Sequence, residues 1–223
     1  CVDVRDAAAV NRLFAEFHPD AVIHTAALMS GDAMMTTTNV EGTRNIARAA
    51  AQSFDSANAP LRTRLIHLSS DVIFDGEHAP YTENDTPAPI TSYGESKVRA
   101  ERAVIEECSS AVLVRTSLIY GFDPIDPRTQ QILDGAMPRL FTDEYRCPIF
   151  VDDLADALIE IAGQTSEVLK TSEVSVLNIA GAQRLSRYKL GVKLANAFHT
   201  VPRFEPALCA SHPAPRPRDC TLD

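Results

Sequence analysis

The sequence lacks the features that mark membrane, metal-binding and nucleic-acid-binding proteins. No apolar run among its 223 residues approaches the roughly 20 needed to cross a bilayer, and no signal peptide is visible. The five cysteines include no CxxC pair and are odd in number, which predicts a reduced, cytoplasmic protein without a metal site. The net charge of −9, without any Lys/Arg run, argues against nucleic acid and anionic membranes as partners.

A glycine-rich phosphate-binding turn is also missing. In dinucleotide-binding α/β domains, G-x-G-x-x-G or G-x-x-G-x-x-G joins the first strand to the first helix and cradles the pyrophosphate. Neither pattern occurs, and the chain begins at Cys1 and enters directly into CVDVRD. We therefore expect the first β-α-β unit, about 30 residues or more, to lie upstream of Cys1. This fragment alone is then expected to be inactive.

What the sequence does contain is an alternation of buried strands and helices. The apolar runs 21–27, 64–70 and 111–121 have the composition of strands that are buried on both faces. The stretches 36–53 and 91–108 between them have helical spacing of apolar residues. This order predicts the α/β class, with a Rossmann-like, doubly wound parallel sheet.

Local signals extend the pattern in both directions. Asp6 is expected to cap a helix that Pro19 ends. Beyond residue 121 the rhythm is looser and the tail is rich in proline. There we expect a helix at about 128–136, a short strand and an Asp152-capped helix within 146–163, a strand at 175–181, and a Ser186-capped helix at 185–198.

Two stretches carry side chains suited to carbonyl chemistry. HLSSDVIFDG (67–76) ends a predicted strand at Ser70, and SYGESK (92–97) opens a predicted helix with Tyr93 and Lys97. Ligands of open α/β sheets bind at the carboxyl ends of strands, and residues four apart on a helix share a face. We therefore expect both stretches to belong to one site.

The residue types fit the reduction of a carbonyl group. A tyrosine donates a proton to the developing alkoxide, and a nearby ammonium lowers its pKa from the ordinary value of about 10. A serine hydroxyl holds the carbonyl oxygen, while the hydride must come from a cofactor. Taken alone, however, a Y-x-x-x-K pattern on a helix is more often a solvated face.

Seven stretches together have a recognisable pattern. They are PDAVIHTAA (19–27), LSSDVIFDG (68–76), PYTENDTPAPITSYGESKVRAE (80–101), VLVRTSLIYG (112–121), FVDDLADAL (150–158), NIAGAQRLSRYKLG (178–191) and RPRDCTLD (216–223). With them the chain resembles the extended short-chain dehydrogenase/reductase superfamily, and most closely its RmlD-like (dTDP-4-dehydrorhamnose reductase) branch. The resemblance covers nearly the whole chain, and the block at 80–101 is the most specific.

The resemblance implies a role for each matching residue. Catalysis would use Ser70 to orient the substrate, Tyr93 as general acid/base and Lys97 to bind the nicotinamide ribose and tune Tyr93. The other implied contacts are Asp3 with the adenine, the backbone of Ala26 and Ala27 with the cofactor, and Asp71 with the substrate. Arg216 and Arg115 are implied more weakly as substrate contacts. The implied cofactor is NADPH or NADH, and the implied substrate is a nucleotide sugar.

The resemblance also predicts the domain organisation. Residues 1–121 would form a Rossmann-type NAD(P)-binding domain that lacks its first β-α-β unit. Residues 122–223 would form mainly a substrate-binding lobe, with the segment at about 146–163 returning to the core domain.

Several positions depart from the branch. LMSGDAMM (28–35) replaces a V-D-x-A-E segment, Val72 replaces an aromatic residue, and Leu118 replaces a tryptophan. Ser70 stands where the branch usually has threonine. The first three positions would contact the sugar and its nucleotide, so a different sugar nucleotide, or no turnover at all, is consistent with the sequence.

Three functions therefore stay open at this point. The full-length protein is an NAD(P)-dependent reductase or epimerase of a nucleotide sugar, or a non-catalytic RmlD-like subunit similar to the regulatory β subunit of methionine adenosyltransferase, or a truncated gene product with neither role. A second copy of the chain or a larger partner subunit would be its macromolecular partner.

Other polar residues have plainer interpretations. His24 and His67 lie in apolar strands and are expected to be packed there, not to bind a ligand. Arg115 is as consistent with a structural ion pair as with substrate binding. The stretch DEYR (143–146) is expected to be a solvated loop, and the carboxylates of VDDLAD (151–156) are expected to be a helix cap and a helix-surface residue, with no metal bound.

Overall fold

The chain forms two compact units that are interleaved along the sequence. The computed structural model describes residues 2–52, 63–163 and 174–223. The first unit is Cys1–Ser70, Ser92–Arg115 and Ala157–Leu177, and the second is Asp71–Thr91, Thr116–Asp156 and Asn178–Asp223. The predicted division at residue 121 concerns where cofactor and substrate bind, and it stays a prediction.

A four-stranded sheet organises the first unit. Its strands occur in the order β1 (Ala21–His24), β2 (Arg64–Leu68), β3 (Val112–Thr116) and β8 (Ser175–Ile179), the last residues of β3 and β8 being counted with the second unit. β1 pairs with β2, and β2 with β3, in parallel. This confirms the predicted Rossmann-like α/β class.

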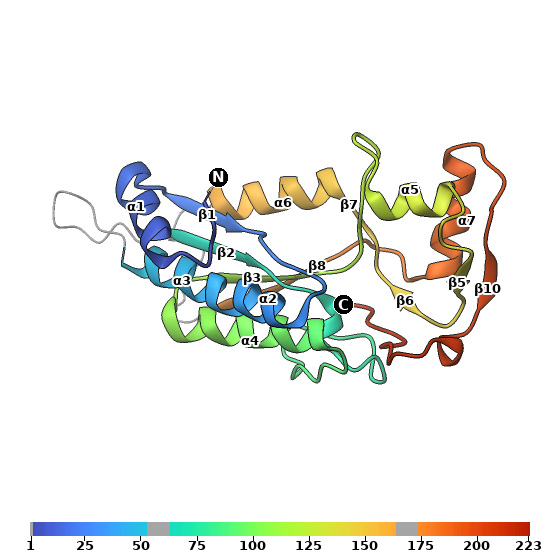
Figure 1. Cartoon of the computed structure of the whole chain (residues 1–223), viewed down its shortest axis with the longest axis horizontal. Helices are drawn as coiled ribbons and strands as arrows, with labels where there is room; N and C mark the ends of the chain where they lie inside the picture. Colours follow the sequence, from blue (N-terminus) through green and yellow to red (C-terminus); the bar gives the residue numbers. More distant parts are fainter. Residues whose placement is uncertain (1, 53–62, 164–173) are drawn as a thin grey trace. The chain divides into compact units, whose positions relative to one another are not determined.

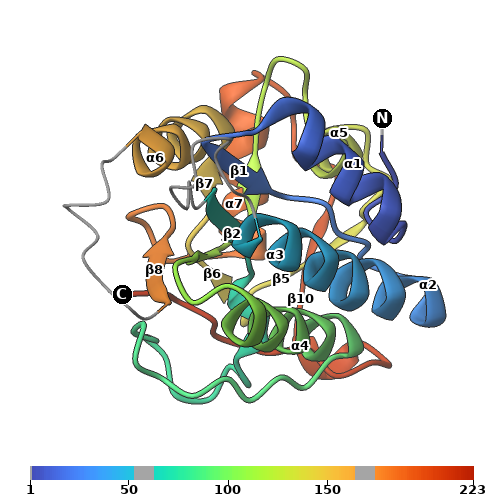
Figure 2. The same cartoon turned by 90° about the vertical axis from the view of Figure 1, so that its left-hand side faces the viewer.

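Helices cover both faces of this sheet. α1 (Ala7–Phe17), α3 (Thr43–Ala51) and α4 (Ser92–Glu107) lie on one face. The part of α6 (Val151–Gly163) that belongs to the first unit lies on the other face (Figures 1 and 2). On that side Arg64 Nη1 donates a hydrogen bond to the carbonyl oxygen of Ile161, at 2.9 Å.

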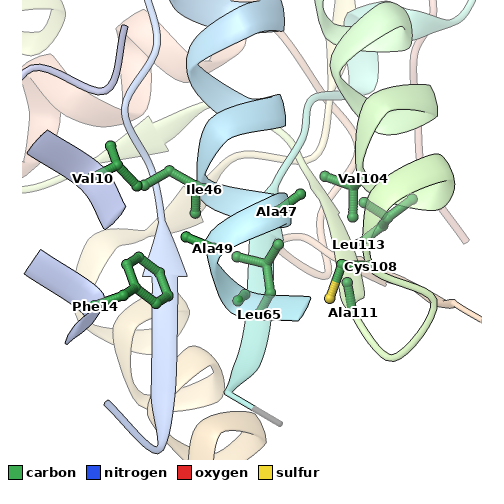
Figure 3. Close-up of a cluster of buried hydrophobic side chains, with 11 residues drawn as sticks. Val10, Phe14, Ile46, Ala47, Ala49, Leu65, Val104, Cys108, Ala111 and Leu113 are labelled. Atoms are coloured by element: carbon green, nitrogen blue, oxygen red, sulfur yellow. The ribbon is translucent and has the colours of Figure 1, made fainter. Parts of the chain in front are cut away.

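The core of the first unit lies between these helices and the sheet. Figure 3 shows apolar side chains from α1, α3 and α4 meeting those of β2 and β3. The small alanine side chains of α3 let the helix backbone approach the strands closely, which is why the Ala-rich stretch is a buried helix. The cluster consists of Val10, Phe14, Ile46, Ala47, Ala49, Ala50, Leu65, Val104, Cys108, Ala111 and Leu113.

The start and end of α1 follow the sequence signals. Asp6 accepts a hydrogen bond from the backbone N–H of Ala9 at 3.0 Å, which confirms the predicted cap. His18 adopts the left-handed conformation, with φ of 44°, and Pro19 follows it. The cap predicted at Asp152 is wrong, because α6 already begins at Val151 and Asp152 lies within its first turn.

The second helical stretch differs from a regular helix. It begins at α2 (Asp32–Thr36), passes through a π-helical turn η1 (Thr37–Gly42) and continues as α3. The prediction of a helix at 36–53 therefore placed its start four residues too late, and residue 53 lies outside the described residues. π-turns insert one extra residue per turn and often occur at functional sites.

The second unit is built from short paired strands, the helices α5 and α7, and the first six residues of α6. β5 pairs with β10 and β4 with β7 in parallel, while β6 and β9 are antiparallel. Its elements are η2 (Asp71–Ile73), β4 (Ile119–Tyr120), α5 (Pro127–Leu133), β5 (Arg139–Phe141), β6 (Tyr145–Arg146), β7 (Ile149–Phe150), β9 (Leu185–Ser186), α7 (Arg187–Ala197), β10 (Glu205–Ala207) and η3 (Cys209–Ser211).

A small apolar core holds α5 and α7 to β5. It consists of Ile132, Leu140, Leu190, Leu194 and Phe204. The helix approaches closely at Gly191, where a Cβ atom would collide with the side chains of Leu140 and Phe204. The Ser186 side chain accepts from the Lys189 N–H at 3.1 Å, which confirms the predicted cap of α7.

Two further findings bear on the sequence interpretations. Arg115 on β3 and Glu101 on α4 form an ion pair at 3.0 Å that is almost fully buried, which confirms the structural interpretation of Arg115. Within the described ranges, no helix combines the length and the apolar character that a membrane span requires.

Candidate active site

Lys97 is buried at the carboxyl end of β2. Its side chain leaves α4, and its Nζ donates a hydrogen bond of 2.6 Å to the carbonyl oxygen of Leu68, the last residue of that strand. Only 3% of Lys97 is exposed. The ammonium group is therefore held two residues before Ser70, as expected if the two sequence stretches share one site.

Tyr93 and Ser70 lie beside this point in the first unit. Tyr93 is one helical turn before Lys97 on α4, and both Tyr93 and Ser70 are partly buried. The N–H of Ser69 donates to the Val114 carbonyl oxygen at 2.6 Å, which continues the β2–β3 ladder past the end of β2. This bond fixes the place where Ser70 leaves the sheet.

Burial changes the acidity of Lys97. Desolvation disfavours its charged form and lowers its pKa from 10.5 to about 8, although the Glu101 carboxylate opposes the shift. The group is still mostly protonated at neutral pH. An ammonium at this place favours the phenolate form of a nearby tyrosine and so lowers the tyrosine pKa.

Two buried histidines lie close to Lys97. His24 on β1 is 2.9 Å from the Thr43 hydroxyl through its Nε2 atom, and its ring centroid is 5.3 Å from that of His67 on β2. Both are packed strand residues, as predicted. Burial, aided by the Lys97 charge, lowers the pKa of His24 to about 4 and that of His67 well below 6.5.

Acidification should therefore destabilise the first unit. A histidine whose folded pKa is depressed contributes stability above its unfolded pKa, and that stability is lost as the pH falls toward the folded pKa. We expect His24 alone to cost about 2 kcal/mol between about pH 7.5 and pH 5. Urea unfolding of the protein and of His67→Leu at several pH values would measure this. The variant should have the shallower acid dependence, and an equal slope would contradict the assignment to the histidines.

The residues predicted to contact the cofactor are exposed. Ala26 and Ala27 follow β1, and both residues are exposed. Asp3 is about half exposed and forms an ion pair with Arg5 at 2.6 Å, and the hydrogen bonds from Arg5 lower the pKa of Asp3 to about 2. Its carboxylate is thus ionised and already has a partner.

The predicted substrate contacts Asp71 and Arg216 belong to one buried network of the second unit. Asp71 is 3% exposed, accepts from the Ser117 hydroxyl at 2.6 Å and lies 3.5 Å from Arg146 Nε. Arg216 Nε donates to Glu144 at 2.5 Å, and Arg146 lies 3.4 Å from the same carboxylate. Arg146 and Glu144 therefore connect the two predicted residues.

The solvated loop predicted at 143–146 is wrong for two of its residues. Glu144 is fully buried and Arg146 is 2% exposed. Charge normally indicates a surface position, but here Arg187 and Arg216 reach the Glu144 carboxylate at 2.7 and 2.5 Å and compensate its burial. These partners are 43 and 72 residues away in sequence, so no local pattern indicates the network.

Sequence reasoning also missed Asn39. This residue lies in the π-turn η1, is 1% exposed, and bonds both to the segment after β1 and to α4. The only signal was a polar residue among small ones in NVEGTRNIARAA, where Asn usually faces solvent.

Known proteins resemble this chain over its whole length. The family model of the RmlD substrate binding domain matches residues 1–223. Methionine adenosyltransferase 2 subunit beta of Rattus norvegicus is 26% identical over 100% of this chain and 68% of its own length. The dTDP-4-dehydrorhamnose reductase of Mycobacterium tuberculosis (strain CDC 1551 / Oshkosh) is 30% identical over 97% and 71%.

A solved structure agrees with these relatives in fold. The dTDP-4-dehydrorhamnose reductase of Bacillus anthracis in complex with NADP matches 99% of this chain and 76% of its own, with a TM-score of 0.82 and 23% identity. At that identity the likeness speaks for the fold alone. Together with the family model and the 30% identical relative, it completes the assignment: the chain belongs to the RmlD substrate-binding domain family.

Proposed function

We propose that the protein is an NAD(P)-dependent reductase of a nucleotide-sugar carbonyl, similar to dTDP-4-dehydrorhamnose reductase. The observation that carries the proposal is the buried Lys97 ammonium, fixed at the end of β2 by the Leu68 carbonyl oxygen, with Tyr93 one turn earlier on the same helix. Burying a charged lysine costs free energy, and buried groups with a shifted pKa cluster at functional sites.

Each residue has a distinct task in this proposal. Tyr93 donates the proton to the carbonyl oxygen, and Lys97 lowers the tyrosine pKa by favouring the phenolate. Ser70 donates a hydrogen bond that orients the carbonyl. The family resemblance also assigns Asp71 and Arg216 to the substrate, and both have partners within the protein.

The residues present fit a nicotinamide cofactor. The backbone at Ala26 and Ala27 would line it. The Lys97 ammonium has further N–H donors besides the one bonded to Leu68, and these would bind the ribose hydroxyls. When bound, NADPH or NADH supplies the hydride of the reduction. Asp3 would approach the adenine, as the family resemblance implies.

The alternative is a non-catalytic binding subunit. It is favoured by the match to methionine adenosyltransferase 2 subunit beta. This match covers the whole of this chain, and the relative is named as a subunit of an enzyme. In that case Tyr93 and Lys97 would serve binding only, and the protein would assemble with a larger partner.

Removing the proposed acid separates the two functions. In the protein as it occurs naturally we expect Tyr93→Phe to lower kcat for dTDP-4-dehydrorhamnose with NADPH at least about a hundredfold, because general acid catalysis contributes 10²–10⁴. NADPH oxidation measures the rate, and thermal unfolding checks the fold. Tyr188→Phe, which removes a hydroxyl from α7 in the second unit, is the matched control and should keep the rate.

Two results would contradict the reductase. One is turnover that Tyr93→Phe leaves unchanged. The other is no turnover of any nucleotide-sugar ketone by the natural protein, together with co-purification of a larger partner, which would support the binding subunit.

A further inference from the structure

We infer that Tyr81 is a positioning residue of the second unit, whose hydroxyl closes the turn at residues 75–78 and thereby holds the segment 216–223, which begins with Arg216. This inference rests on the proposed function, which assigns Arg216 to the nucleotide sugar. Tyr81 itself is only 4% exposed. It therefore acts through its neighbours and not by touching a substrate.

The hydroxyl of Tyr81 gathers the backbone of the turn around one oxygen atom. Three successive N–H groups, those of Gly76, Glu77 and His78, donate to this oxygen at 3.0, 3.1 and 3.0 Å. The hydroxyl itself donates to Asp75 Oδ1 at 2.5 Å. Successive backbone N–H groups that point to one place form a site for negative charge, and donation to a carboxylate makes the phenol oxygen a stronger acceptor.

The proton and the ring of Tyr81 are both fixed. The bond from Tyr81 lowers the pKa of Asp75, while burial and the same bond raise the pKa of Tyr81 above its ordinary value. The proton therefore stays on Tyr81 at neutral pH. The ring stacks on the fully buried Phe74, with the centroids 4.1 Å apart and the planes 5° from parallel.

The closed turn lies directly against the residues that follow Arg216. The carbonyl oxygen of Gly76 accepts from the Asp219 N–H at 3.1 Å. Gly76 has φ of 84°, and a Cβ atom at this position would collide with the backbone nitrogen of Arg218. Only glycine combines this conformation with so close an approach. The turn therefore supports the segment backbone to backbone, two or three residues after Arg216.

The backbone of Tyr81 holds the end of the same segment. Its N–H donates to the Thr221 carbonyl oxygen at 2.8 Å, and its carbonyl oxygen accepts from the Asp223 N–H at 2.9 Å. The same carbonyl oxygen also accepts from Asn178 Nδ2 at 3.0 Å. These bonds do not involve the side chain of Tyr81, so a variant that loses only the hydroxyl tests the turn by itself.

The opposite side of the segment is held by β6. The Tyr145 N–H donates to the Arg218 carbonyl oxygen at 2.6 Å. Arg146 Nη2 donates to the Pro217 carbonyl oxygen at 3.0 Å. The segment after Arg216 is thus held between β6 and the turn. Hydrogen bonds and ion pairs weaken steeply when their geometry changes. Opening the turn should therefore weaken the contact of Arg216 with the substrate and leave the proton transfer from Tyr93 intact.

Three variants of the natural protein test the attachment. Tyr81→Phe removes the hydroxyl and keeps the ring and the backbone bonds. Gly76→Ala leaves the hydroxyl in place but puts a Cβ atom against the backbone of Arg218. Asp75→Asn keeps a side-chain oxygen that accepts from the Tyr81 hydroxyl, so it is the conservative variant.

Asp126→Ala is the matched control. The Asp126 carboxylate also accepts from three backbone N–H groups of the second unit, at 3.2, 3.0 and 3.0 Å, and these belong to Gly121, Arg128 and Thr129. None of them lies in the turn or in the segment 216–223. The control therefore loses a comparable set of hydrogen bonds without touching the attachment.

The expected kinetic result separates positioning from stability. Tyr81→Phe should raise the KM for dTDP-4-dehydrorhamnose about tenfold with kcat nearly unchanged, since the lost contact is made equally in the ground state and the transition state. Calorimetry with dTDP alone should show a similar loss of affinity. Gly76→Ala should act in the same direction, and Asp75→Asn should stay close to wild type.

The control decides whether this effect is specific. Asp126→Ala should lower Tm by about as much as Tyr81→Phe while it keeps the wild-type KM. An equal rise of KM in Asp126→Ala, or a wild-type KM in Tyr81→Phe, would overturn the inference.

A readout without turnover distinguishes failure of this inference from failure of the proposed function. Amide hydrogen exchange at Asp219, whose N–H bonds to the turn, should quicken about tenfold or more in Tyr81→Phe and stay unchanged in Asp126→Ala. If the wild-type protein neither turns over a nucleotide sugar nor binds dTDP but this difference appears, the proposed function fails and the positioning of the segment by Tyr81 stands. If exchange at Asp219 is the same in Tyr81→Phe and wild type, the hydroxyl does not hold the segment and the inference is wrong.

Discussion

Replacing Lys97 by methionine is expected to make the protein more stable and catalytically inert. The pKa of about 8 means that burying the charged group costs about 3 kcal/mol at neutral pH. Methionine fills a similar volume without charge, at the expense of about 1 kcal/mol for the lost bond to Leu68. We expect a net gain of about 2 kcal/mol in the free energy of unfolding at pH 7.

The stability contribution of Lys97 depends on pH. The folded pKa of Lys97 lies below the unfolded value of 10.5, so the unfolded chain binds more protons between about pH 8 and 10.5. The contribution of Lys97 to stability is therefore present above pH 10.5 and is lost as the pH falls through about 8. Urea unfolding of wild type and Lys97→Met from pH 7 to 10 should show the stability difference shrinking as the pH rises.

Lys97→Met should lower the catalytic activity although it raises the stability. Lys97→Met should lower kcat strongly, as Tyr93→Phe does, because it removes both the tuning of Tyr93 and the proposed ribose contact. Lys189→Met, on an exposed lysine of α7, is the control and should leave both quantities nearly unchanged. A Lys97→Met protein that is less stable than wild type at pH 7 would contradict the view that this charge is kept for function.

Among the variants proposed, Glu144→Gln should lower the free energy of unfolding most. Three guanidinium groups, those of Arg187, Arg216 and Arg146, lie within 2.7, 2.5 and 3.4 Å of its fully buried carboxylate. Burial alone would raise the pKa of Glu144, but these groups lower it to about 2. Glu144→Gln leaves the arginines without their shared anion, which should cost about 3–5 kcal/mol.

Denaturant unfolding at pH 7 measures this loss. The control is Glu106→Gln, whose carboxylate pairs with Arg44 at 2.8 Å but is 58% exposed, and it should cost under about 1 kcal/mol. Because the folded pKa of Glu144 is depressed, its contribution is present above pH 4.5 and is lost as the pH falls toward 2. A Glu144→Gln protein as stable as wild type would contradict the view that the three arginines depend on this carboxylate.

Periodicity and local chemistry were enough to predict the elements that position the candidate site. The short apolar runs predicted the strands of the sheet, and the four-residue spacing of Tyr93 and Lys97 predicted that they share a helix. Three predicted strands ran two or three residues too far at their carboxyl ends, as at 25–27, and the run 111–121 is divided into β3, which ends at Thr116, and β4. Such residues keep an apolar composition after the hydrogen-bonded ladder has ended, and composition does not show where pairing stops.

The contacts that act between distant residues could not be predicted in this way. Asn39 and Ser96 are 57 residues apart, and Glu144 and Arg216 are 72 apart. Polar residues are predicted to lie on the surface unless a partner is known. Here the fold brings a distant partner close, and its hydrogen bonds offset the free-energy cost of burial. The same reason explains why Glu144 and Arg146 were expected to be solvated.

The interleaved order of the two units has a consequence for the timing of synthesis. The first unit takes the start of its fourth strand from Ser175–Leu177, after all of Thr116–Asp156 of the second unit has been made. At about 5–20 residues per second, β3 waits several seconds on the ribosome before its neighbour β8 is synthesised. During this interval one edge of β3 is open to chaperones or to pairing with another nascent chain, and slow translation of residues 116–174 would prolong the exposure.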